Sequence, residues 1–280
     1  MKVSYECLAS YFHLGEAPKP DAIPDMLNFH SFEVESTETL PGGDFLYDVK
    51  GLPNRGHDAL SHWSIAWELA TISGKKLDTR FFEEKIKIFS DTTSEELLSL
   101  IVEDSVLVPR ALKRIAEVKV TESPEWMKKR LAAIGQRSIN AIVDATNYLT
   151  QELGQPVHAF DYDKLAGSGK KEIVIRHAKP GEKVTTLDGK VYELEPWMLV
   201  IADSEKALDI AGIKGGTNSG IDENTKRVVL SACTFNGPTI RKTSQKLGLR
   251  TDASIRFQHG LSAHLAEMGM KRLTQLIDEL

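Results

Sequence analysis

The sequence predicts an α+β fold, in which a small mixed N-terminal domain precedes a larger domain built on a central, mainly antiparallel sheet. Alternating apolar residues mark short strands along the chain, and segments of helical period between capping residues mark helices. The pair Asp188-Gly189 between two strand-like runs is typical of an antiparallel hairpin. With 280 residues, of which 41% are hydrophobic, the chain has enough apolar content for one large or two modest cores.

In the N-terminal domain, alternation at 32–34 and 45–49 predicts two strands joined through the Pro-Gly-Gly at 41–43. A helix follows, for which Asp58 is the expected N-cap and Gly74 the residue just past its end.

The polar segment at 91–94 is expected to be a linker between the two domains. We therefore assign the N-terminal domain to residues 1–85 and the second domain to residues 86–280.

In the second domain we expect a helix over 125–134, with Ser123 as its N-cap, and another that starts at about Ser138 or Asn140 and stops near Gly154. A last helix starts at about Ser262, and its apolar face reaches the end of the sequence, so we expect either a longer chain or a partner that covers this face. The expected strands lie at 173–175, 184–187, 190–194, 198–201, 208–213 and 228–230.

Composition excludes some classes of protein. The N-terminus has no signal-peptide pattern and no apolar stretch is long enough to cross a membrane, so we expect a cytoplasmic protein with no membrane partner. Cys7 and Cys233 show no metal-ligand spacing, and we expect no disulfide.

Charge is unevenly distributed within the formal net charge of −5. Residues 1–50 carry nine acidic residues and three lysines. By contrast, a basic run near the C-terminus is opposed only by Asp252 and is suited to nucleic-acid phosphates, although a solvated helix face would have the same pattern. The run comprises Arg241, Lys242, Lys246, Arg250 and Arg256.

The remaining candidate motifs are ambiguous by themselves. The glycines at 212, 215, 216 and 220 do not match a dinucleotide-binding fingerprint, and they indicate close backbone approach to a strand or to a ligand. His57, Asp58 and His62 lack the further ligand that a zinc site needs. His158, in a turn-like stretch after a helix that carries Thr146 and Asn147, is compatible with a structural or a catalytic role.

Two long segments closely resemble the editing-domain signature of the β subunit of bacterial phenylalanyl-tRNA synthetases. They are Ser-Ile-Asn-Ala-Ile-Val-Asp-Ala-Thr-Asn-Tyr at 138–148 and Glu-Leu-Gly-Gln-Pro-Val-His-Ala-Phe-Asp at 152–161. Shorter matches in the same order extend the resemblance over nearly the whole chain, at 2–5, 31–35, 53–62, 185–189, 199–203, 211–216 and 249–257.

The resemblance implies a protein without the tRNA-binding OB-fold that this family inserts between Glu35 and Pro53, and without the family's C-terminal domains. It implies the α subunit and phenylalanine tRNA as partners. Amino-acid activation with ATP and magnesium is expected on the α subunit, so no cofactor or metal is expected on this chain. The implied activity here is editing, the hydrolysis of tyrosine wrongly esterified to phenylalanine tRNA.

The resemblance also implies roles for individual residues. His158, Thr146 and Asn147 correspond to catalytic positions of the editing site. Gly212, Ser231 and Ala253 correspond to substrate-binding positions, with Gly212 leaving room for the ligand. Arg241, Lys242, Lys246 and Arg250 are the expected RNA-binding residues.

Two positions depart from the family pattern. Ser231 replaces a glutamate that is taken to accept the tyrosine hydroxyl, and a neutral serine accepts a weaker hydrogen bond. His259 stands in Gln-His-Gly where the family has Glu-Arg-Gly, which alters the ion pairs available there. Two alternatives to editing within the ligase therefore stay open, a non-catalytic module with a decayed pocket and a free-standing hydrolase that edits in trans.

Overall fold

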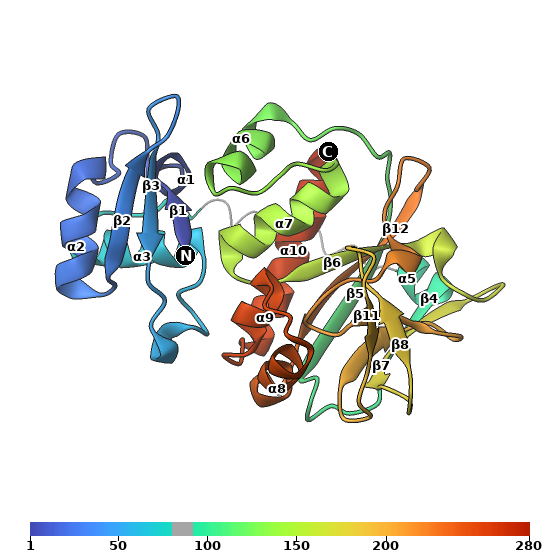
Figure 1. Ribbon diagram of the computed structural model, residues 1–280. Helices are drawn as coiled ribbons and strands as arrows, with labels where there is room; N and C mark the ends of the chain where they lie inside the picture. Colours follow the sequence, from blue (N-terminus) through green and yellow to red (C-terminus); the bar gives the residue numbers. More distant parts are fainter. Residues whose placement is uncertain (80–91) are drawn as a thin grey trace.

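The computed structural model describes residues 1–79 and 92–280, which form the two parts visible side by side in Figure 1. The N-terminal part has an antiparallel sheet of strand order β1-β3-β2 with helices packed around it. Its elements are β1 Lys2–Ser4, α1 Tyr5–Ala9, α2 Ile23–His30, β2 Val34–Thr39, β3 Phe45–Val49 and α3 His62–Ser73. The predicted strand pair forms as β2 and β3, but β2 begins only at Val34, so Phe32 lies before it.

Helix α3 ends where the sequence predicts but begins later. Gly74 closes it in the left-handed conformation, with φ of 67°. The N-cap is Ser61, whose Oγ accepts a hydrogen bond from the Ser64 N–H, and not Asp58. Asp58 instead accepts hydrogen bonds from the Arg55 guanidinium, three residues before it.

The second part confirms the α+β class and the mainly antiparallel pairing, but its strands divide between two sheets and a hairpin. One sheet has the order β11-β10-β7-β4, in which β4 and β7 are parallel, and the other has the order β5-β12-β6. The Asp188-Gly189 hairpin joins β8 and β9 as predicted. The strands are β4 Leu98–Val102, β5 Arg110–Glu117, β6 Val157–Asp161, β7 Lys171–His177, β8 Lys183–Thr185, β9 Val191–Glu193, β10 Leu199–Ala202, β11 Ala207–Ile210 and β12 Arg227–Thr234.

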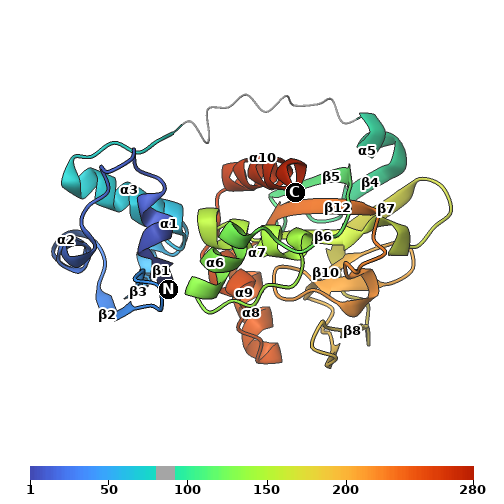
Figure 2. The same ribbon diagram turned by 90° about the horizontal axis from the view of Figure 1, so that it is seen from above.

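Helices α7 and α10 pack against the β5-β12-β6 sheet, as Figure 2 shows from above. Asn140, one of the two predicted starts, caps α7, and Gly154 ends it as predicted. The helices of this part are α5 Thr92–Leu97, α6 Glu125–Ala133, α7 Ala141–Leu153, α8 Gly237–Leu247, α9 Asp252–Phe257 and α10 Ala263–Glu279.

Three expectations about this part need correction or restriction. Ser123 does not cap α6, because its hydroxyl donates to the buried carboxylate of Asp144 and Pro124 takes the cap position. The assigned boundary at 85/86 and Asp91 lie outside the described residues, while Thr92–Leu97 form α5 instead of a linker.

Residues of this chain cover most of the apolar face of α10, although Leu280 at its end is only partly buried. Leu273 and Leu276 are fully buried in a cluster with Leu149 of α7 and Val228 of β12. A second core region lies on the other side of the sheet, where Phe160 packs with residues of β7, β10 and β11.

Candidate functional site

His158 lies on a strand and not in the predicted turn. It sits on β6, in register opposite Ser231 on β12. Its ring packs edge-on against Phe160 at 4.6 Å between centroids, and its side chain is 35% exposed. The pairing places the two residues side by side, although they are 73 residues apart in the sequence.

A wide cavity of about 430 Å³ lies beside His158. Thr146 and Asn147 of α7 line it together with His158 and Ala253. The Thr146 hydroxyl donates to the carbonyl of Val143 at 2.7 Å, so this side chain offers the cavity only an acceptor oxygen and a methyl group. Asn147 is half-buried, and no hydrogen bond from the described residues engages its side-chain amide, which leaves the carbonyl and the NH2 group for a ligand.

A small cavity of about 100 Å³ adjoins the wide one. His158, Gly215 and Ala253 line both cavities, so they stand where the two meet. Gly212 and Ser231 line only the small cavity. Its apolar wall is formed by Val157, Ile201, Ile210, Ile213, Phe235 and Phe257. Every predicted catalytic and substrate-binding residue therefore lines one or both of these cavities.

Gly212 is required mainly by the protein's own packing. Its φ of +67° is a conformation that L side chains rarely adopt, and an added Cβ would lie 2.8 Å from Ile240 Cδ1 and 2.9 Å from Phe235 Cδ2. Gly215 better fits the role of leaving space beside the ligand, because a Cβ there would lie 3.1 Å from His158 Cε1.

Ser231 is 7% exposed and presents a neutral hydroxyl to the small cavity. Its Oγ lies 3.5 Å from the Sγ of Cys233. Burial raises the pKa of the Cys233 thiol to about 11, so the thiol is neutral and inert as a nucleophile near pH 7. Both cysteines are buried and free.

Sequence reasoning missed Asp209 on β11. This carboxylate is 5% exposed, lines the small cavity and has its Oδ2 3.5 Å from His158 Nε2. Burial raises the pKa of Asp209, and the neighbouring His158 and the Gly216 N–H oppose that shift. The available signal was an acidic residue inside the apolar run 207–213, where a buried strand was predicted.

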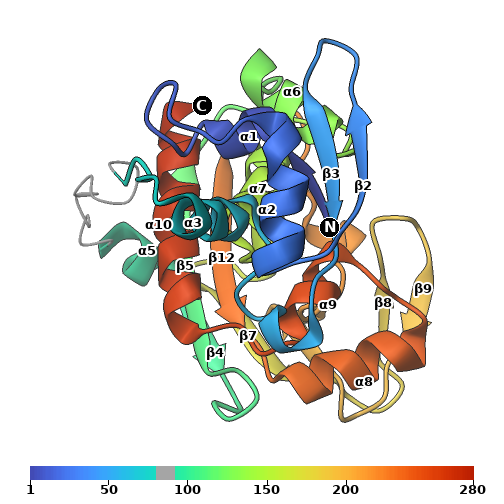
Figure 3. The same ribbon diagram turned by 90° about the vertical axis from the view of Figure 1, so that its left-hand side faces the viewer.

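The predicted RNA-binding residues lie apart from these cavities. Helix α8 runs along one edge of the molecule (Figure 3), with Arg241, Lys242 and Lys246 exposed on it. Lys242 Nζ lies 3.8 Å from the ring centroid of Trp197, and Lys246 pairs with Glu195 at 3.2 Å.

Arg250 borders a third cavity, the interdomain cavity of about 520 Å³. Residues of both parts of the chain line it, among them Lys2, Leu52, Gln258 and His259. Gln136, Gln151 and Asp252 line both this cavity and the wide cavity, and the two amides donate hydrogen bonds to the Asp252 carboxylate at 3.0 and 3.2 Å.

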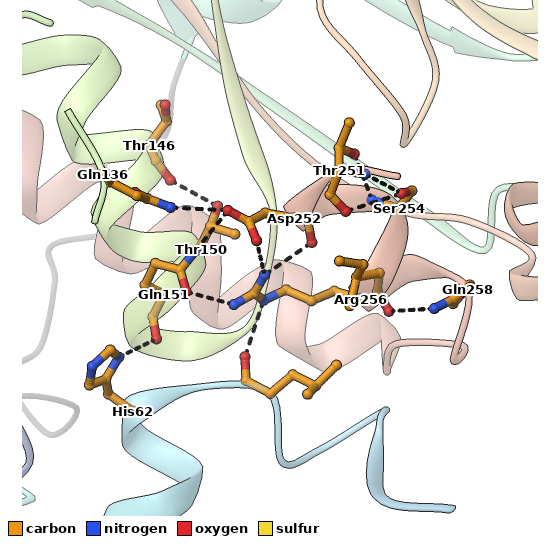
Figure 4. A network of polar contacts seen from close by, with 12 residues as sticks. His62, Gln136, Thr146, Thr150, Gln151, Thr251, Asp252, Ser254, Arg256 and Gln258 are labelled. Carbon is orange, nitrogen blue, oxygen red and sulfur yellow. Dashed lines mark hydrogen bonds and ion pairs between the residues drawn. The ribbon is translucent and has the colours of Figure 1, made fainter. Parts of the chain in front are cut away.

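Arg256 is not available for phosphates, although it belongs to the basic run. It is 3% exposed and donates hydrogen bonds to Gln151 Oε1 at 2.8 Å, the Asp252 carbonyl at 3.0 Å and the Leu60 carbonyl at 3.1 Å (Figure 4). These bonds join α9 to α7 and to the N-terminal part. Arg256 therefore has a structural role.

His62 also holds the two parts together. Its Nε2 accepts from the Ser4 N–H at 3.2 Å, and its Nδ1 donates to the Gln151 carbonyl at 3.0 Å. Burial lowers the pKa of His62 to about 4, so the ring is neutral. Within residues 1–79 and 92–280 we find no group of three or more His, Cys, Asp or Glu side chains arranged to hold a metal ion. Nor does any helix in those ranges have the length and apolarity needed to cross a membrane.

Comparison with known proteins gives the family. A model of the B3/4 domain matches residues 107–280. The phenylalanine–tRNA ligase β subunit of Carboxydothermus hydrogenoformans is 42% identical over 238 residues, which cover 85% of this chain and 29% of that protein. That of Geobacter metallireducens is 42% identical over 274 residues, covering 98% and 33%.

A solved N-terminal fragment of the phenylalanyl-tRNA synthetase β subunit from Pyrococcus horikoshii is 13% identical, with a TM-score of 0.44 over 89% of this chain and 74% of that one. The chain spans about a third of the length of the curated relatives it matches. It belongs to the B3/4 domain family, and those relatives are phenylalanine–tRNA ligase β subunits.

Proposed function

We propose that this chain works within a phenylalanine–tRNA ligase and hydrolyses the ester that joins tyrosine wrongly to phenylalanine tRNA. One observation carries the proposal: residues from α7, β6, β12, α9 and the loop after β11 line two adjoining cavities, with His158 where they meet. An aminoacyl ester needs such a pair of spaces, because its side chain and its ribose lie on opposite sides of the scissile bond.

In this arrangement the amino-acid side chain occupies the small cavity and the terminal ribose occupies the wide one. The ester carbonyl then lies near His158. Its Nε2 faces Asp209, which leaves Nδ1 on the other side of the ring to accept a proton from the attacking water. Attack forms a tetrahedral oxyanion, which the Asn147 amide N–H groups stabilise. The ribose oxygen leaves with the proton, and free tyrosine and intact tRNA result.

The tRNA reaches the site through the interdomain cavity in this proposal. That cavity is lined by the cations Lys2 and Arg250 and shares Gln136, Gln151 and Asp252 with the wide cavity. Arg241, Lys242 and Lys246 on α8 provide further phosphate contacts. Because the chain as a whole is acidic, its own affinity for tRNA is low, and the α subunit and the rest of the ligase supply most of the binding. Activation with ATP and magnesium occurs on the α subunit, in the cytoplasm.

The test is deacylation of tyrosyl-tRNA(Phe), with phenylalanyl-tRNA(Phe) as the second substrate. We expect the chain to hydrolyse the tyrosyl ester selectively and the His158→Ala variant to lose at least about a hundredfold in rate, the usual contribution of a general base. His264→Ala is the matched control, because that side chain is 90% exposed and lies outside both cavities. Equal rates for wild type and His158→Ala would reject the catalytic role.

The neutral Ser231 favours a second function, a non-catalytic module of the ligase whose pocket has decayed. That function predicts no hydrolysis of either ester, even when the α subunit and the remainder of a ligase are added. Activity of the chain by itself at rates sufficient to clear free mischarged tRNA would instead favour editing in trans.

A further inference from the structure

Among the residues that the structure describes, the small cavity is lined by one carboxylate, Asp209, whose hydrogen-bonding capacity is only partly used. Asp209, Ser231, His158 and Lys214 are its polar side chains besides the Cys233 thiol. Lys214 pairs with Asp188 at 2.9 Å, outside the cavity. Asp209 is the carboxylate of the set, and it is 5% exposed.

Asp209 is only partly satisfied by the residues that the structure describes. Its Oδ1 accepts the Gly216 N–H at 2.9 Å. Its Oδ2 lies 3.5 Å from His158 Nε2, which is too long for a strong hydrogen bond. A carboxylate has about four acceptor positions, and a buried charge without sufficient partners is costly. A donor brought by a ligand would offset that cost.

The surroundings of Asp209 indicate what kind of ligand would bring the donor. Most of the cavity wall is apolar, with Phe235 and Phe257 in edge-on contact at 5.0 Å between centroids. Such a wall accepts an aromatic ring. A polar group on that ring binds well only where it reaches one of the few polar side chains of the cavity. Ser231 is a weaker partner for a hydroxyl, because a hydrogen bond to a neutral oxygen is about half as strong as one to a carboxylate.

We propose that Asp209 accepts a hydrogen bond from the hydroxyl of an aromatic side chain bound in the small cavity and so makes the site selective for tyrosine over phenylalanine. The proposal rests on the proposed editing function and adds its specificity determinant. Asp209 then supplies, from β11, the carboxylate that position 231 on β12 does not provide. Burial raises the pKa of Asp209, which agrees with a group that gains from a new donor.

The test compares the wild-type chain with Asp209→Asn. Asparagine keeps the acceptor for the Gly216 N–H and removes the charge. We measure kcat/KM for tyrosyl-tRNA(Phe) and phenylalanyl-tRNA(Phe), and expect the tyrosine-to-phenylalanine ratio to fall at least about tenfold, with the loss on the tyrosyl ester. Asp209→Ser, also neutral and smaller, should give the same loss if Asp209→Asn folds poorly.

The matched control is Asp203→Asn. Asp203 is 4% exposed and accepts backbone N–H groups of Ala166, Glu205 and Lys206, away from both cavities. This variant should keep the wild-type ratio. A ratio that is unchanged in Asp209→Asn, or equal slowing of both esters, would overturn the proposal.

Binding of L-tyrosinamide and L-phenylalaninamide, measured by titration, separates this proposal from the editing function. If the wild type hydrolyses neither ester, the editing function fails. Preference for tyrosinamide that disappears in Asp209→Asn would still support the role of Asp209. Equal binding of the two amides by the wild type would overturn that role.

Discussion

Ser231 on β12 lies directly opposite His158 on β6, and both side chains line the small cavity. The antiparallel register therefore puts a candidate catalytic residue and a candidate substrate contact next to each other in a rigid sheet. Because β12 is the central strand of β5-β12-β6, Ser231 has a paired strand on each side, opposite Lys113 of β5 and His158 of β6.

Gly215→Ala should reduce hydrolysis without unfolding the protein. The added Cβ would lie 3.1 Å from His158 Cε1 and 3.3 Å from Leu187 Cδ1, so the imidazole must shift from the position in which we propose that it contacts the ester. We expect a loss of at least about tenfold in kcat/KM for tyrosyl-tRNA(Phe). Gly220→Ala is the control on the rim of the same cavity, since its Cβ would meet nothing nearer than 3.7 Å. Equal activity of the two variants would contradict this account.

Gly212→Ala should destabilise the fold more than Gly248→Ala. Both glycines have a positive φ, +67° and +64°, so both variants incur a backbone cost of roughly 1–2 kcal/mol. At Gly248 an added Cβ meets nothing within 4 Å, whereas at Gly212 it clashes with Ile240 and Phe235. That clash adds about 1–3 kcal/mol to the loss of unfolding free energy. Urea denaturation gives the difference, and equal losses would refute the packing argument.

Arg256→Met should lower the free energy of unfolding by about 3 kcal/mol. The change leaves the Gln151 side-chain oxygen and the Leu60 carbonyl without their donor at the contact between the two parts. Arg241→Met on the exposed face of α8 should change stability by less than about 0.5 kcal/mol. Indistinguishable denaturation midpoints for the two variants would show that the Arg256 contacts are not structural.

Because of His62, the free energy of unfolding should decrease as the pH is lowered from about 6.5 to about 4. The ring is neutral in the folded state, where burial lowers its pKa to about 4, while the unfolded chain takes up a proton near the ordinary value of 6.5. The unfolded state therefore binds more protons in this window. Above pH 6.5 the titration of His62 does not lower the free energy of unfolding, and below pH 4 it lowers that free energy by about 3 kcal/mol.

The comparison with His62→Gln isolates this effect from the titration of carboxylates. Glutamine can accept from the Ser4 N–H and donate to the Gln151 carbonyl, but it does not titrate. We expect its unfolding free energy to decline less steeply between pH 6.5 and 4. Parallel pH profiles for the two proteins would mean that His62 is not buried neutral.

Local signals predicted much of the fold. Asn140 and Gly154 bound α7 as their capping chemistry requires, and Asp188-Gly189 forms its hairpin. The predictions of individual capping residues fail where a long-range contact outweighs the local signal. Ser123 has the chemistry of a cap, yet its hydroxyl donates to Asp144, which is 21 residues away.

The candidate site shows the same division. The resemblance to a known family identified His158 as a candidate site residue. The sequence does not show that His158 lies on a strand, because that strand is defined by its pairing with β12. Asp209 was missed because its importance depends on proximity to His158 across the fold. Arg256 was grouped with phosphate-binding cations because sequence does not reveal that Gln151 and Leu60 surround it.

The rate of tyrosyl-tRNA(Phe) hydrolysis under single-turnover conditions, with this chain in excess, tests the central claim most directly. The account predicts release of tyrosine well above the uncatalysed rate, little release of phenylalanine from phenylalanyl-tRNA(Phe), and loss of activity in His158→Ala. Hydrolysis no faster than in buffer, both for the chain alone and after addition of the remainder of a phenylalanine–tRNA ligase, would contradict it.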